Sequence, residues 1–419
     1  MNKTILQKKI NIYEVFLALT LFIFSVFALE GSNESAKILI PYINANPTFL
    51  HLALTVLLCL FFLLIKIKRN DKIEFDIVCI LLLFQCVLNL LPIIRPNFDA
   101  TDFWGHYLNT LMSLIIYFIF YNSNIETKSV VKYFVIFGIV ISIQVIWTAL
   151  LIDIPFSDVV FKNYMRIPYS SSNMICTILV PIVFMVMRAN IKSLWKLLIV
   201  FLLIVGIVLC HSRGGILILA VMTLIELITR IMRQKNKVLY CLVLCTIIII
   251  GIGVFLFEPS VKRFLLGYIA DKEFTLDGLT SGRLSIYIAQ LKTVKQSPIF
   301  GTGLFYSADA PSGAHNLFID LLAKCGIVGF IVYTLALYFV FRKTSKKMFK
   351  IYKYEIQPLY IFLISLFLYS MIEVCYFNYN SDLIFWMIAG ILQSKKAFCR
   401  HESNMLEVNK LELATNNTN

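Results

Sequence analysis

The chain alternates between long apolar runs and short polar stretches along almost its whole length. An α-helix needs about 20 consecutive apolar residues to cross the hydrocarbon core of a bilayer. Twelve runs approach that length, and the last of them is the shortest. They are residues 12–29, 49–65, 75–94, 104–121, 131–152, 172–187, 194–210, 214–229, 238–257, 316–341, 356–372 and 382–393. The pattern predicts an all-α, polytopic membrane protein with about 12 transmembrane helices.

The polar stretches between these runs are short, with one exception, residues 258–315. We therefore expect four regions along the chain. They are residues 1–257 with transmembrane helices 1–9, a large loop at 258–315, residues 316–393 with helices 10–12, and a polar tail at 394–419.

The large loop contains an amphipathic pattern of its own. Its apolar residues Leu284, Tyr287, Ile288, Leu291 and Val294 recur at helical spacing, with Lys292 and Lys295 off that stripe. A glycine-rich turn follows at residues 298–303. The spacing predicts an amphipathic helix that lies on the membrane surface.

Composition agrees with a lipid environment. Hydrophobic residues make up 59% of the chain and charged residues 15%, whereas a soluble domain has about 25% charged residues. The net charge of +14 would suggest nucleic acid in a soluble protein. Here Lys and Arg cluster between apolar runs, so we expect them to contact membrane lipid, and we expect no nucleic-acid partner.

The same clusters predict an orientation. Most Lys and Arg fall in alternate loops, for example around residues 66–72, 230–237 and 342–353. Because Lys and Arg favour the cytoplasmic side, both chain ends are predicted inside and the 258–315 loop outside a bacterial inner membrane. A site built from that loop would face the periplasmic, extracytoplasmic side.

Four of the five histidines fall at the predicted outer face, namely His51, His106, His211 and His315. His211 belongs to the run His-Ser-Arg-Gly-Gly, which joins two apolar runs with almost no loop. Arg213 then lies at the mouth of a helical hairpin, where a charge usually marks function. The alternative is that Arg213 reaches out to the lipid headgroups.

His315 directly precedes the tenth apolar run. The positive end of a helix dipole disfavours the imidazolium, and a neutral imidazole is what a general base requires. The alternative is that His315 or Asn316 only caps the helix, which suits Asn better than His. Asp320 and Lys324 are four residues apart in the same run, and we expect them to pair.

Several motifs are absent from the sequence. It contains no Walker A motif, no Asp-x-Asp motif, no Cys-x-x-Cys and no Cys/His spacing typical of a metal site. We therefore expect no cofactor and no metal. A donor would have to arrive through the lipid on the outer side, and a lipid-linked pyrophosphate fits, since arginines can neutralise its charge.

Three elements, taken in order, resemble the superfamily of O-antigen ligases and O-antigen polymerases. The first is His211 to Gly215. The second is Ser281-Gly-Arg283 with Tyr287, followed by Pro298 to Gly303. The third is Ala314-His-Asn-Leu with Gly326-Ile-Val-Gly329, and Ser172-Asn173 is similar to a weaker element. The superfamily often has Trp near the Tyr287 position. This chain has Tyr there, so an aromatic residue is kept.

The resemblance implies a metal-independent glycosyltransferase that takes glycan from undecaprenyl pyrophosphate at the outer face. It implies that Arg213 and Arg283 bind the pyrophosphate, that His315 activates the acceptor hydroxyl as the catalytic base, and that the anomeric carbon is inverted. We also place His211, Asn316 and Tyr287 among the substrate-binding candidates.

Three functions are considered. The leading hypothesis is a polymerase that extends lipid-linked O-antigen or capsular repeat units. The alternative is an O-antigen ligase with lipid A-core as acceptor. The less favoured alternative is a secondary transporter or flippase, which usually has its longest loop in the cytoplasm and related halves. No intramembrane acidic residue stands out as a coupling site for transport.

Overall fold

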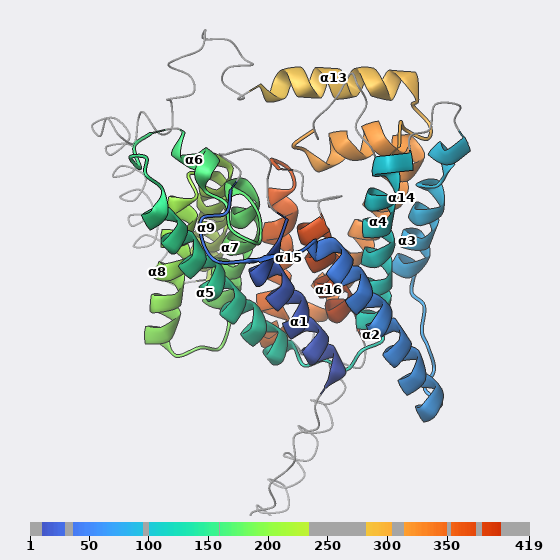
Figure 1. The fold of residues 1–419 in the computed structure, drawn as a ribbon. Coiled ribbons are helices and arrows are strands. Elements are labelled where there is room, and N and C mark those ends of the chain that lie inside the picture. The colour runs from blue at the N-terminus through green and yellow to red at the C-terminus, as the bar shows by residue number, and fades with distance from the viewer. Residues whose placement is uncertain are drawn as a thin grey trace, which may run out of the picture.

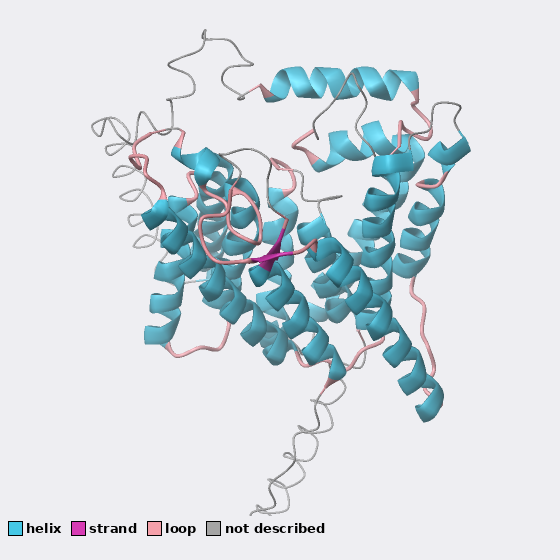
Figure 2. Cartoon of the chain, in the orientation of Figure 1, coloured by secondary structure: helices cyan, strands magenta, loops and turns pink. Residues whose placement is uncertain are grey.

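The computed structural model describes residues 11–29, 37–94, 100–158, 160–233, 282–303, 314–349, 353–373 and 379–394. Within these ranges the chain is a bundle of helices (Figure 1; Figure 2). The helices up to the short α6 are α1 (Ile12–Val26), α2 (Pro47–Arg69), α3 (Ile77–Leu88), η2 (Leu91–Ile94), α4 (Ala100–Tyr121), α5 (Thr127–Leu151) and α6 (Phe161–Tyr164). The later helices are α7 (Ser172–Arg188), α8 (Ser193–Leu209), α9 (Arg213–Arg233), α13 (Arg283–Gln296), α14 (Leu317–Phe349), α15 (Lys353–Tyr369) and α16 (Tyr379–Gln393).

Each predicted apolar run except 238–257 coincides with one of these helices, and that run lies outside the described residues. Pro47–Arg69, Thr127–Leu151 and Leu317–Met348 are long and apolar enough to cross a bilayer by themselves, and several shorter apolar helices stand beside them. The predicted helical, polytopic membrane protein is thus confirmed. The tail after residue 394 and the loop residues 258–281 and 304–313 also lie outside the described residues.

A small strand pair departs from the all-α prediction. β1 (Phe27–Ala28) pairs in parallel with β2 (Ile43–Asn44), with Phe27 opposite Ile43. The pair ties the end of α1 to the approach to α2. Hydrophobic periodicity could not predict these strands, because two residues are too few to show a period.

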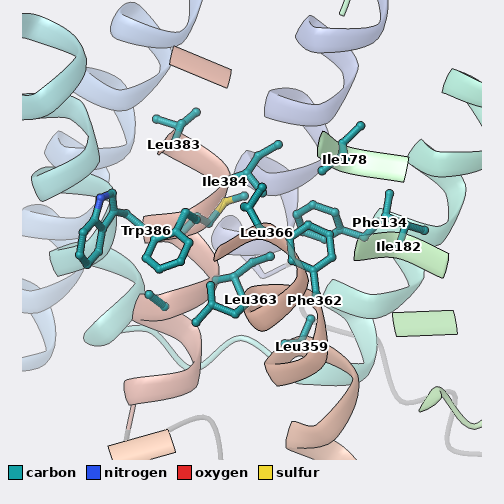
Figure 3. Close-up of a cluster of buried hydrophobic side chains, with 14 of the residues drawn as sticks. Phe134, Ile178, Ile182, Leu359, Phe362, Leu363, Leu366, Leu383, Ile384 and Trp386 are labelled. Carbon is teal, nitrogen blue, oxygen red and sulfur yellow. The ribbon is translucent and has the colours of Figure 1, made fainter. Parts of the chain in front are cut away.

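A cluster of buried hydrophobic side chains lies where α5, α7, α15 and α16 meet (Figure 3). Phe134 and Phe362 pack there with ring centroids 5.1 Å apart. On α7 and α16 even the residues on opposite sides of the helix are buried. A helix that is apolar all round belongs in the interior of a bundle, which is where both helices lie.

α2 and α8 have the opposite character. Large apolar side chains such as Leu64, Ile67, Leu197 and Phe201 are 61–76% exposed on them. An apolar surface of this extent is unfavourable in water and favourable against lipid tails. These two helices therefore form part of the lipid-facing side of the bundle.

α13 lies across one end of the bundle, at the top of Figure 1, and α6 lies at the same end. The predicted helix in the large loop is therefore present, with the polar residues Gln290 and Thr293 buried against the protein. Ile288 and Leu291 from the predicted apolar stripe are exposed, at 49% and 46%. These two residues are thus turned away from the described part of the chain, as in a helix in contact with lipid, whereas Leu284, Tyr287 and Val294 are half-buried.

Candidate active site

The buried carboxylate of Glu373 lies where four segments meet at the α13 end of the bundle. Glu373 follows α15 and is 7% exposed. Its Oε1 atom is 2.6 Å from Nδ1 of His315, which precedes α14. Its Oε2 atom accepts a hydrogen bond of 3.0 Å from Nδ2 of Asn173 in the first turn of α7, and lies 3.6 Å from the guanidinium of Arg283. Residues far apart in sequence thus converge on one charge.

Arg283 is the first residue of α13. Its guanidinium donates to the carbonyl of Ile372 and forms the ion pair with the neighbouring Glu373. Gly282 precedes it with a positive φ of 80°, a conformation that glycine adopts without steric cost. The side chain remains 26% exposed, so Arg283 holds the start of α13 against the end of α15 and still reaches solvent.

The sequence left open whether His315 or Asn316 caps the start of α14, and in the structure Asn316 does so. Asn316 Oδ1 accepts hydrogen bonds from the backbone N–H groups of Phe318 (3.0 Å) and Ile319 (3.2 Å), so Asn316 caps α14. His315 has a φ of 47°, which is uncommon for a residue other than glycine and costs about 1–3 kcal/mol. In that conformation its ring contacts Glu373 instead of the helix end.

The contact between His315 and Glu373 determines what the imidazole can do. When Nδ1 carries the hydrogen, it donates to the carboxylate and leaves the lone pair of Nε2 to accept a proton. The carboxylate also stabilises the imidazolium that results, as in a catalytic triad. The His315 side chain is 31% exposed, so a substrate hydroxyl can approach it.

The Ser-Arg-Gly-Gly run forms the start of α9. Ser212 Oγ accepts from the backbone N–H of Gly215 at 3.1 Å and so caps the helix. A Cβ atom at Gly215 would lie 2.8 Å from the side chain of Cys176 on α7. The glycine therefore lets α9 approach α7 closely, which brings Arg213, at the first position of α9, to the α13 end of the bundle.

Asn173 links this run to the buried carboxylate. Ser212 Oγ donates to Asn173 Oδ1 at 3.0 Å, and Asn173 Nδ2 donates in turn to Glu373. The hydroxyl of Tyr369 donates to the carbonyl of Asn173 at 3.1 Å. A continuous series of hydrogen bonds thus runs from Ser212 to His315, so two of the predicted motifs belong to one polar network.

His211 has a different environment from His315. It is buried, with a φ of 51°, and its ring lies against Phe156 and Phe161 with centroids 4.1 and 5.0 Å away. Burial lowers the pKa of His211, and the positive charge of Lys162 lowers it further. Both effects favour the neutral form of the ring, which packs between aromatic side chains.

Lys162 on α6 adds a third cation to this end of the bundle. Burial lowers the pKa of Lys162, the negative charge of Glu373 raises it, and the positive charges of Arg213 and Arg283 lower it. Lys162 is therefore within electrostatic reach of Arg213, Arg283 and Glu373. Tyr287 lies one turn after Arg283 on α13, at a half-buried position.

The glycine-rich turn after α13 packs against α14. The backbone N–H groups of Thr302 and Gly303 donate to the carbonyls of Ala323 and Lys324, at 2.9 Å in both bonds. The N–H of Ile327 donates to the carbonyl of the turn's proline at 2.9 Å. This turn, residues 298–303, is therefore attached to α14 by backbone hydrogen bonds.

Two glycines allow that contact. Gly301 and Gly326 both have positive φ, 67° and 64°, and α14 bends at Gly326. A Cβ atom on either would collide with the backbone of the other segment. Beside the bend, the expected pair of Asp320 and Lys324 is confirmed, with Oδ2 and Nζ 2.8 Å apart in the interior. Asp320 Oδ1 also accepts from the backbone N–H of Ala314 at 3.1 Å, which fixes the residue before His315.

Sequence reasoning missed Glu373 and Lys162. Glu373 lies one residue beyond the predicted run 356–372, so it counted as a loop residue, although an acid beside an apolar run is itself a signal of function. The expectation that no intramembrane acid stands out as a coupling site for transport stays a prediction. Asp382 is buried on α16 and accepts from Ser113 (2.8 Å) and Trp386 (3.1 Å). These contacts satisfy it within the core.

Within the described ranges, no group of three or more His, Cys, Asp or Glu side chains is arranged to hold a metal ion. Metal independence stays a prediction.

The comparisons with known proteins agree with the motifs. The model of the O-antigen ligase family matches residues 198–334, from α8 into α14. The predicted resemblance to the O-antigen ligase and polymerase superfamily is thereby confirmed, and glycan transfer related to O-antigen is supported in general. All six candidate residues lie inside the match, whereas Lys162, Asn173 and Glu373 lie outside it. No curated protein matches the chain.

Proposed function

Because residues 198–334 match the O-antigen ligase family, we propose that this membrane protein transfers glycan from undecaprenyl pyrophosphate to a sugar hydroxyl. The observation that carries the proposal is the 2.6 Å contact between Nδ1 of His315 and Oε1 of Glu373. A carboxylate-oriented imidazole beside arginines combines a base for the acceptor with cations for an anionic leaving group.

The reaction would be one direct displacement. Nε2 of His315 takes the proton of the acceptor hydroxyl, and the oxygen attacks the anomeric carbon of the donor sugar. The bond between that carbon and the pyrophosphate oxygen breaks, and undecaprenyl pyrophosphate leaves with the bonding electrons. Arg213 and Arg283 neutralise the charge that develops on it. A single displacement inverts the anomeric carbon.

Glu373 acts on His315 alone in this scheme. It holds the imidazole with Nε2 free and stabilises the imidazolium after proton transfer, which is the role of a positioning residue. Asn173 and Arg283 in turn hold Glu373. Asn316 caps α14, and its amide donates to the carbonyl of Met371 at 3.1 Å, so the cap also ties α14 to the end of α15.

The acceptor distinguishes two versions of the function. We favour polymerisation, in which the growing lipid-linked chain moves onto the next lipid-linked repeat unit. The description of the matching family favours the second version, ligation onto lipid A-core. In both versions the site faces the outer side of the bacterial inner membrane, because the donor glycan lies there.

The test is reconstitution of the purified protein in liposomes with a lipid-linked single repeat unit. Polymerisation predicts longer lipid-linked chains from that substrate alone. Ligation predicts no change until lipid A-core is added, after which the glycan moves to it. Absence of transfer to either acceptor, with intact donor and folded protein, would contradict the proposed function.

A further inference from the structure

α6 is held in place beside His211. Phe161 is buried and packs on the ring of His211, which adjoins the start of α9. The segment after α6 is fixed as well, because Nδ2 of Asn380 donates to the carbonyl of Tyr169 at 2.6 Å. Lys162 follows Phe161 directly, so its position at this end of the bundle is determined by packing on both sides.

Lys162 is in an unfavourable electrostatic environment. It is half-buried, and its pKa is lowered first by that burial and then by the charges of Arg213 and Arg283. Glu373 attracts it, but its Nζ makes no hydrogen bond or ion pair with any residue that the structure describes. A cation held beside two others at the edge of a membrane usually marks a site for an anion.

We propose that Lys162 binds the pyrophosphate of the lipid carrier as a third cationic residue, together with Arg213 and Arg283. This inference rests on the proposed function and deepens it. Two phosphate groups bring two negative charges, which would relieve the repulsion among three cations. A lysine ammonium is a compact point charge that suits a phosphate oxygen, whereas the arginines supply planar, bidentate contacts.

The alternative is that Lys162 serves only as a counter-ion that stabilises Glu373. The two roles predict opposite effects on stability. Lys162→Met would remove a partly desolvated charge that is repelled by Arg213 and Arg283, so a binding residue should leave thermal stability unchanged or higher while affinity falls. Loss of a structural counter-ion should lower stability and leave the affinity for pyrophosphate unaltered.

The experiment measures binding of two lipid probes to the full chain in detergent, undecaprenyl pyrophosphate and undecaprenyl monophosphate. Wild type should prefer the pyrophosphate. Lys162→Met should lose roughly ten- to hundredfold in affinity for it, the range for a charged hydrogen bond, and Lys162→Arg should keep most of the preference. Lys292→Met, an exposed lysine on α13, is the matched control and should bind as wild type does.

Unchanged affinity in Lys162→Met, with the preference of wild type intact, would overturn the role of Lys162 and leave the proposed function standing. No preference in wild type would overturn the pyrophosphate donor and the inference together. If Lys162→Met does not fold, the inference is tested instead by chemical acylation of the lysines in the wild-type protein, with and without the lipid. Undecaprenyl pyrophosphate should protect Lys162 and not Lys292, and equal labelling of Lys162 with and without the probe would overturn the inference.

Discussion

Nδ1 of His315 and Oε1 of Glu373 lie 2.6 Å apart, although His315 precedes α14 and Glu373 follows α15. The pair combines a left-handed backbone at His315 with a carboxylate that Asn173 and Arg283 hold from the other side. Glu373 thus holds Nδ1 of the ring, while Asn173 and Arg283 hold Glu373.

Replacement of Glu373 tests the positioning role. Glu373→Gln keeps the size of the side chain but removes the charge that orients the imidazole and stabilises the imidazolium. We expect transfer to fall by about 10²-fold or more, with little change in the KM for the lipid donor. Asp153→Asn, an exposed carboxylate near the same end of the bundle, is the control and should transfer normally. A Glu373→Gln enzyme with wild-type kcat would show that the pair is structural.

Replacement of the arginines tests charge neutralisation. Arg213→Ala and Arg283→Ala should each lower transfer by about 10²–10³-fold while protein levels remain normal. Lysine should rescue poorly, because it lacks the planar fork of the guanidinium. The measurement is polymer length and amount in cells, with immunoblotting for the protein. Normal polymer from Arg283→Ala would remove that residue from the site.

The glycines at the contact between residues 298–303 and α14 supply a test of the fold. Gly301→Ala should lower thermal stability in detergent strongly, because its Cβ would collide with the backbone of Lys324. Gly282→Ala is the matched control, since Gly282 also has positive φ but nothing lies within 4 Å of the added Cβ. We expect it to cost only about 1–2 kcal/mol of unfolding free energy for the left-handed backbone. Equal melting temperatures for the two variants would refute the close contact.

Membrane orientation has a direct test. With the native cysteines removed, a cysteine at Lys292 on α13 should react with an impermeant maleimide in intact spheroplasts. A cysteine at Lys346, an exposed position near the end of α14, should react only after lysis. The reverse pattern would place the site on the wrong side for a donor glycan that lies outside.

The sequence predicted the helices well and the site in part. The transmembrane helices were predictable from the apolar runs. A helix that crosses a bilayer must be long and hydrophobic, and both properties are local to the sequence. Arg213 and His315 were noticed as polar groups beside apolar runs, and Arg283 was noticed through its Ser-Gly-Arg motif. Glu373, the partner of Arg283 and His315, was not found, because packing between α7, α13, α14 and α15 brings it to them. Long-range pairing of this kind leaves no periodic trace in the chain.

Single residues show the same limit. The pair of Asp320 and Lys324 was predictable, since four residues along a helix place two side chains on one face. The cap by Asn316 was predictable from its residue type. The role of Asn173 as the link between Ser212 and Glu373 was not, since it depends on the close approach of α9 to α7 at Gly215.

The central claim is that His315 accepts the proton of the acceptor hydroxyl. His315→Gln keeps a hydrogen-bonding side chain toward Glu373 but cannot take a proton at neutral pH. His51→Gln is the control, because His51 is buried, and its Nδ1 and Nε2 lie 2.9 and 3.1 Å from the carbonyl oxygens of Pro47 and Thr20 and not beside Glu373.

The decisive measurement is the rate at which the purified His315→Gln protein, in liposomes, transfers glycan from a lipid-linked repeat unit. We predict a rate about 10²–10⁴-fold below wild type, with the lipid donor still bound. Transfer by His315→Gln at a rate close to that of wild type would contradict the account, since the proton of the acceptor would then have to leave by another route.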